Sequence, residues 1–135
     1  TLHAQGLDWE TWFQTFRQGA NGHNVNNAQA LTSAAVWYRQ AKNETLHKLS
    51  LSRMAALDAR NGLPTGMFIG DEIVPGHRTR DPSRGSELCG VVEAMWSYSV
   101  MFATHGDVAF ADRVERIAYN ALPATWASPK GGDMW

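Results

Sequence analysis

Apolar residues recur at intervals of three and four through most of the chain, which is the spacing that one buried face of an α-helix requires. In the first half, this pattern predicts an amphipathic helix within residues 2–16 and a second helix over 24–42. Asn43 is a suitable N-cap for a third helix, which we expect to end at Gly62.

The second half shows the same pattern. Ser86 is expected to cap a helix that has Glu87 at its first position and ends at Gly106. Asp107 is expected to cap a last helix, which Pro123 ends. Consecutive amphipathic helices joined by short turns predict an all-α fold built of helical hairpins.

Residues 63–85 lack a helical period and are rich in glycine and proline, so they predict a long loop, with room for a short β-hairpin around 67–69. A loop of this length inside a compact domain is usually functional. The loop leads directly to Glu87 and Cys89, which favours a functional role.

Composition limits the class of protein. The 135 residues are 44% hydrophobic and 19% charged, with a formal net charge of −1, which is typical of one globular domain. No basic block interleaves with aromatic residues, so neither nucleic acid nor an anionic membrane is an expected partner. No apolar run approaches the ~20 residues of a membrane span, no signal-peptide pattern is present, and localisation stays unassigned.

The ends of the chain point to a piece of a larger protein. The sequence begins without Met inside the first expected helix and stops at Trp135 without a terminating signal. Its six tryptophans, several of them beside polar residues, suit a ligand cleft as well as a core. We therefore expect residues 1–135 to be an internal fragment.

Glu87 and Cys89 are the first chemical candidates, because carboxylate and thiolate are both zinc ligands and both are favoured at a helix N-terminus. Each residue also has a simpler interpretation. Glu87 would complement the helix dipole, and Cys89, the single cysteine, would be a small buried apolar residue. On their own the simpler interpretations are favoured, and two donors cannot close a zinc site.

Further candidates lie at a loop–helix junction and inside the long loop. His23 would either cap a helix or contact a ligand. Glu72 and its neighbour Asp71 would be solvated loop acids or, if apolar residues screen them from water, a proton donor.

Four stretches, taken together and in the same order, resemble glycoside hydrolase family 127, the β-L-arabinofuranosidases. They are 22–31 (GHNVNNAQAL) with 35–38 (AVWY), 62–68 (GLPTGMF) with 70–72 (GDE), 87–89 (ELC), and 113–122 (RVERIAYNAL). Each stretch alone is a weak match, but together they extend over nearly the whole chain.

The resemblance implies an (α/α)6 barrel, of which residues 1–135 would be a part, with β-sandwich domains further along the full protein. It implies a zinc ion bound by one Glu and three Cys, one of whose thiolates attacks the anomeric carbon with overall retention of configuration. A separate Glu is the acid/base. The substrates implied are non-reducing-end β-L-arabinofuranosides, or a related furanoside, in a glycan or oligosaccharide.

Carried over by position, the resemblance makes Glu87 and Cys89 zinc ligands and Glu72 the acid/base, with Asp71 as the nearest competitor. His23 matches a histidine that contacts the sugar. Trp135 lies near an aromatic position that lines the subsite.

The sequence departs from the family in one respect. The family's paired cysteines, both of them zinc ligands and one of them the nucleophile, would lie beyond Trp135. We therefore expect the chain to hold half a zinc site, to be inactive by itself and to expose apolar helix faces. Two alternatives stay open: a non-catalytic helical-hairpin binding or scaffold module, and a six-hairpin glycosidase or lyase that uses only carboxylates.

Overall fold

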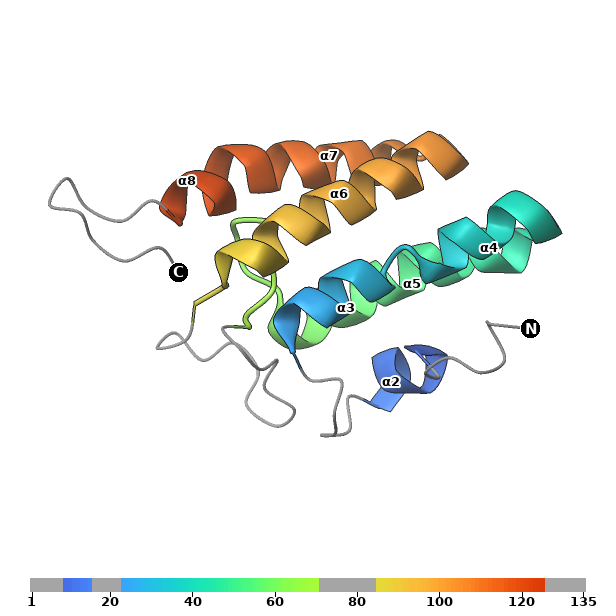
Figure 1. Cartoon of the computed structure of the whole chain (residues 1–135), viewed down its shortest axis with the longest axis horizontal. Helices are drawn as coiled ribbons and strands as arrows, with labels where there is room; N and C mark the ends of the chain where they lie inside the picture. Colours follow the sequence, from blue (N-terminus) through green and yellow to red (C-terminus); the bar gives the residue numbers. More distant parts are fainter. Residues whose placement is uncertain (1–8, 16–22, 71–84, 126–135) are drawn as a thin grey trace, which may run out of the picture.

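The computed structural model describes residues 9–15, 23–70 and 85–125, which form helices joined by turns (Figure 1). The helices are α2 Trp9–Thr15, α3 Asn24–Ala30, α4 Ser33–Ala41, α5 Glu44–Asn61, α6 Leu88–His105, α7 Val108–Arg116, the π-helix η1 Ile117–Ala121 and α8 Leu122–Ala124. The described residues contain no strand, so the predicted all-α class is confirmed. In the same residues, no helix combines the length and apolar character needed to cross a membrane.

α6 lies between two groups of helices. α3 and α4 pack against one side of α6, while α7, η1 and α8 pack against it from another direction (Figure 1). α5 lies on α4, and α2 lies on α5. The core that these contacts bury comprises Trp12, Phe13, Ala28, Ala30, Leu31, Ala35, Leu57, Met67, Phe68, Val91, Ala94, Tyr98, Met101, Phe110, Ile117 and Ala121.

The single helix predicted over 24–42 is in fact two helices, with a break between Ala30 and Ser33. The Thr32 hydroxyl donates to the Gln29 carbonyl, and the Ser33 hydroxyl donates to the Ala30 carbonyl, both at 2.8 Å. Such side chain–backbone bonds compete with the regular helical ladder, which explains the break.

The predicted caps hold at the two hairpin turns. The Asn43 side chain accepts from the Thr45 amide at 2.9 Å, and the Asp107 side chain accepts from the Ala109 amide at 3.0 Å. Gly106 ends α6 with a φ of 71°, a left-handed conformation that glycine adopts without strain. Gly62 is the C-cap of α5, also as predicted.

The prediction that Pro123 ends the last helix was wrong by one residue, since α8 extends to Ala124. The preceding residues widen into the π-helix η1, in which the Leu122 amide bonds the Ile117 carbonyl. This wider turn precedes a residue that lacks an N–H and cannot join the regular ladder.

A tight turn follows α5 where the sequence allowed a short hairpin. Gly62 and Phe68 form an isolated antiparallel bridge, and the Leu63 amide donates to the Met67 carbonyl at 2.8 Å. A parallel bridge between Gly70 and Ser86 then joins the two ends of the segment 71–84, which lies outside the described residues.

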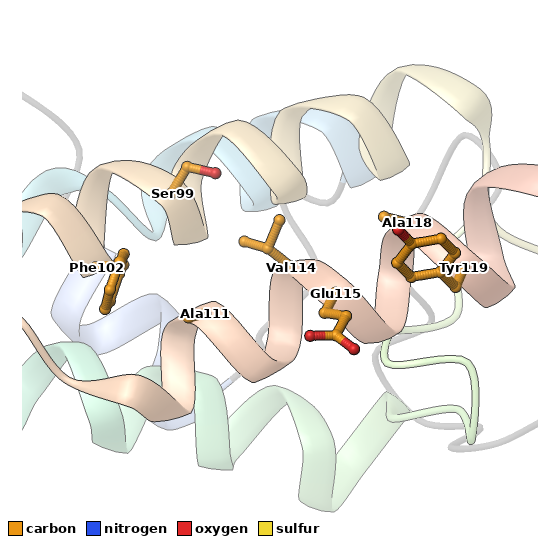
Figure 2. Close-up of a pocket in the computed structure, with 7 residues that line it drawn as sticks. All are labelled: Ser99, Phe102, Ala111, Val114, Glu115, Ala118 and Tyr119. Carbon is orange, nitrogen blue, oxygen red and sulfur yellow. The ribbon is translucent and has the colours of Figure 1, made fainter.

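Apolar side chains are exposed on several of the described helices, α6 among them, as expected for the chain. The large ones are Val36, Trp37, Val92, Trp96, Phe102, Val108 and Tyr119. Ser99 and Phe102 of α6 line a groove of about 530 Å³ with Val114 of α7 and Tyr119 of η1 (Figure 2). None of the predicted site residues that the structure describes lines this groove.

Candidate functional site

The start of α6 differs from the prediction. α6 begins at Leu88, and Glu87 is its N-cap residue, although the Glu87 side chain makes no capping bond to α6. Ser86 does not cap either, because its hydroxyl donates to the Phe68 carbonyl at 2.8 Å. Pairing of Ser86 with Gly70 in the parallel bridge ties it to the preceding segment instead of the helix.

The Glu87 carboxylate caps a different helix. Its Oε1 accepts from the Val25 amide at 3.0 Å, in the first turn of α3. Its two oxygens lie 3.3 and 3.4 Å from Nε2 of His23, and the side chain is 11% exposed. The predicted interaction with a helix dipole is therefore present, but the dipole is that of α3.

His23 is the N-cap residue of α3, yet its side chain makes no capping bond. The ring extends to Glu87, and Nε2 carries the proton that the carboxylate accepts. The His23 carbonyl accepts from the backbone amide and the side-chain amide of Asn27, which orders the first turn of α3. The His23 side chain therefore does not cap the helix, and a ligand contact stays a prediction.

Asn24 holds this arrangement together and was not singled out by the sequence. Its side chain is fully buried, and Nδ2 donates to the Gly70 carbonyl, which also accepts from the Glu87 amide at 3.0 Å. Oδ1 is buried, and no residue in the described part of the chain bonds it. A Cβ at Gly70 would lie 2.7 Å from Asn24 Cγ, and one at Gly90 would lie 2.4 Å from Nδ2. Asn24 therefore fills the space left by the missing side chains of Gly70 and Gly90. In the sequence, its position directly after His23 could have marked it as part of the site.

The remaining predicted site residues lie outside the described part of the chain. These are Glu72, its competitor Asp71, and Trp135. What the structure does describe is the base of the loop, where the Gly70 amide donates to the Gly85 carbonyl at 2.9 Å. Gly70 and Gly85, the described residues on either side of this segment, thus lie near Glu87.

Cys89 lies in the first turn of α6 and is exposed. Its interpretation as a buried apolar residue is therefore wrong. Cys89 and Glu87 supply one sulfur and one oxygen donor from the same helix end, a donor set that zinc accepts. Within the described ranges no three His, Cys, Asp or Glu residues are grouped so as to hold a metal ion.

Comparison with known proteins does not assign a family to the chain. No protein-family model matches the chain, and neither the curated proteins nor the solved structures gave a match. A functional proposal therefore depends on the site residues and on the sequence pattern around them.

Proposed function

We propose that the chain is part of the catalytic domain of a retaining glycoside hydrolase that cleaves non-reducing-end β-L-arabinofuranosides or a related furanoside. One observation carries the proposal. His23 and Glu87, which the family resemblance assigns to one site as sugar contact and zinc ligand, are 64 residues apart in the sequence and in direct contact.

Two residues of the chain would hold the metal. Glu87 and Cys89 would be zinc ligands, completed by two cysteines from elsewhere in the complete protein. When bound, zinc would keep a coordinated thiol deprotonated at neutral pH and so provide a nucleophile. Glu87 is held for this role by the Val25 amide, which leaves the carboxylate little freedom to turn away.

Glu72 would transfer the proton. As an acid it would protonate the leaving oxygen, and as a base it would deprotonate the incoming water. Glu72 follows Gly70 by two residues, so covalent geometry limits the distance between their Cα atoms to about 7 Å. Because the Gly70 carbonyl bonds the Glu87 amide, the acid would operate close to the metal ligand.

His23 would orient the sugar. Its side chain is 38% exposed, so a substrate hydroxyl can reach the ring while Nε2 contacts Glu87. Holding the furanose in the orientation for attack by the nucleophile would by itself provide much of the rate enhancement.

We further propose that the helices belong to an (α/α)6 barrel. The exposed apolar residues of α6, such as Val92, Trp96 and Phe102, support this because a neighbouring hairpin would cover them. The groove in Figure 2 also favours the alternative of a helical-hairpin binding or scaffold module. A reading frame without a Cys-Cys pair downstream of this chain would exclude the zinc-thiolate enzyme and leave the module or a glycosidase or lyase that uses only carboxylates.

Hydrolysis of β-L-arabinofuranosides by the complete protein tests the proposal. Glu72→Gln should lose far more turnover on substrates with poor leaving groups than on activated aryl glycosides, because only the former need protonation. Cys89→Ser should lose both activity and bound zinc. Glu93→Gln, a matched change on α6 outside the site, should retain both. Equal losses on the two substrate classes, or an active Cys89→Ser protein with full zinc, would contradict the proposal.

A further inference from the structure

Two histidines stack at the end of the molecule opposite the candidate site. His47 of α5 and His105 of α6 have ring centroids 4.5 Å apart and planes 14° apart. Tyr38 of α4 packs edge-on against His105 at 4.8 Å, and Phe110 of α7 lies 6.1 Å from it. The stack is therefore the point where α4, α5, α6 and α7 meet, near the turns that join α4 to α5 and α6 to α7 (Figure 1).

The hydrogen bonds of His105 define its proton position. The Ser50 hydroxyl donates to the Leu46 carbonyl at 3.1 Å, so at 3.2 Å from His105 Nε2 it accepts. With the Ser50 hydroxyl bonded to Leu46, the neutral form of His105 carries its proton on Nε2. Its Nδ1 is buried and has no hydrogen-bond partner among the described residues, so a second proton would meet no acceptor there.

Two carboxylates lie near the His47 ring. Its Nδ1 lies 3.7 Å from Glu44 Oε2, and its Nε2 lies 3.4 Å from Asp107 Oδ2. From α4, Tyr38 donates to Glu44 at 2.9 Å. A protonated His105 would stack against the His47 ring.

Two more cations border the cluster from α4. Arg39 Nε donates to the Thr104 hydroxyl at 3.0 Å, and Lys42 Nζ lies 5.7 Å from the Tyr38 ring centroid.

Burial lowers the pKa of His105, as does His47, and these effects outweigh the opposing influence of Glu44 and Asp107. The C-terminus of α6 acts in the opposite direction and favours protonation of His105.

We propose that the His47–His105 stack is a pH-sensitive joint that holds the α4–α5 hairpin to the α6–α7 hairpin at neutral pH and opens when His105 is protonated. Opening exposes Nδ1 to water and separates the two rings. The open state binds a proton more readily than the closed one, so acid favours it, and the closed joint is fully stable only above the ordinary pKa of histidine, about 6.5. The joint is independent of the proposed enzymatic function, since neither histidine belongs to that site.

Hydrogen exchange and a histidine titration by NMR on the 135-residue chain test the joint. His105 should titrate below the ordinary range of histidine. Protection of the Lys42 and Gly106 amides, which bond the Tyr38 and Phe102 carbonyls, should fall in acid after correction for intrinsic exchange. The fall should reach at most about tenfold per pH unit, the limit for one proton.

Two variants separate the ring's charge from its packing. His105→Phe keeps an aromatic ring but cannot take a proton, so the acid-dependent loss of protection should disappear. Ser50→Ala removes the hydrogen bond but keeps the imidazole, so the loss should stay. The same loss in His105→Phe as in the wild type would overturn the proposal. If His105→Phe does not fold, titration of wild-type His105 at or above the ordinary value overturns it.

Discussion

His23 Nε2 lies 3.3 Å from Glu87 Oε1, although α3 and α6 begin in different halves of the chain. The contact exists because Glu87 turns away from its own helix and accepts from the Val25 amide of α3. Packing of α3 on α6 therefore brings these two residues together.

Removing the Glu87 carboxylate should destabilise the chain. Glu87→Ala leaves the partly buried Val25 amide without its acceptor, which costs about 1–3 kcal/mol in the free energy of unfolding. Glu87→Gln keeps an acceptor oxygen and should lose less. Urea unfolding measures both, with Glu93→Ala as the matched change on α6, expected within about 0.5 kcal/mol of wild type. A loss in Glu87→Ala no larger than in Glu93→Ala would contradict the capping role.

Gly90 should not tolerate a side chain. Its Cβ would lie 2.4 Å from Asn24 Nδ2, so Gly90→Ala should cost about 1–3 kcal/mol through overpacking. Gly85→Ala is the matched control, because no atom would lie within 4 Å of that Cβ. Denaturant midpoints compare the two variants.

The Gly90 clash has a specific rescue. If Asn24 causes the loss, Asn24→Ala should be less destabilising in the Gly90→Ala background than in the wild type, which a double-mutant cycle detects. Additive losses from Asn24→Ala and Gly90→Ala would show that the two positions do not oppose each other.

Local rules account for most of the predicted fold. Asn43, Asp107 and Gly106 were predicted correctly because a cap or a left-handed C-terminal residue acts within three or four positions of itself. The break before Ser33 was missed because hydroxyl bonds to the preceding turn leave the apolar period unchanged.

Tertiary contacts account for what the sequence could not predict in the site. Whether Glu87 caps α6 or α3 depends on which helix lies beside it, and spacing along the chain carries no such information. The burial of Asn24 likewise depends on Gly70 and Gly90, which come from two other segments. The roles of Glu72 and Trp135 stay predictions, because both lie outside the described residues.

Tyr98 should make the fold sensitive to alkali. Burial raises the pKa of Tyr98 well above its ordinary value, although nearby Arg113 lowers it. In the unfolded chain the Tyr98 hydroxyl loses its proton at pH ~10. The contribution of the neutral hydroxyl to the free energy of unfolding is therefore complete below that pH and is lost as the pH rises beyond it. Tyr98→Phe should reduce the alkaline fall in urea midpoint, whereas Tyr119→Phe, at a 78% exposed position, should not. An equal fall in wild type and Tyr98→Phe would contradict this.

Arg113 should stabilise the turn after α5. It forms a two-pronged ion pair with Asp58, one bond of which is 2.7 Å, and it donates to the Gly66 carbonyl at 2.8 Å. Arg113→Ala should cost about 2–3 kcal/mol, because it leaves a carboxylate and a carbonyl without their donor. A double-mutant cycle with Asp58→Ala should give a coupling energy above about 0.5 kcal/mol. A smaller coupling would mean that Arg113 acts through packing alone.

The central claim, that Glu87 and Cys89 are ligands of one zinc ion, is tested most directly by cobalt substitution in the complete protein. A thiolate bound to Co²⁺ gives a sulfur-to-metal charge-transfer band, whose intensity follows the number of thiolates. The account predicts this band in the wild type and a weaker one in Cys89→Ser, with a ligand-field spectrum that changes in Glu87→Gln. A charge-transfer band of unchanged intensity in Cys89→Ser, with the ligand-field spectrum also unchanged in Glu87→Gln, would contradict it.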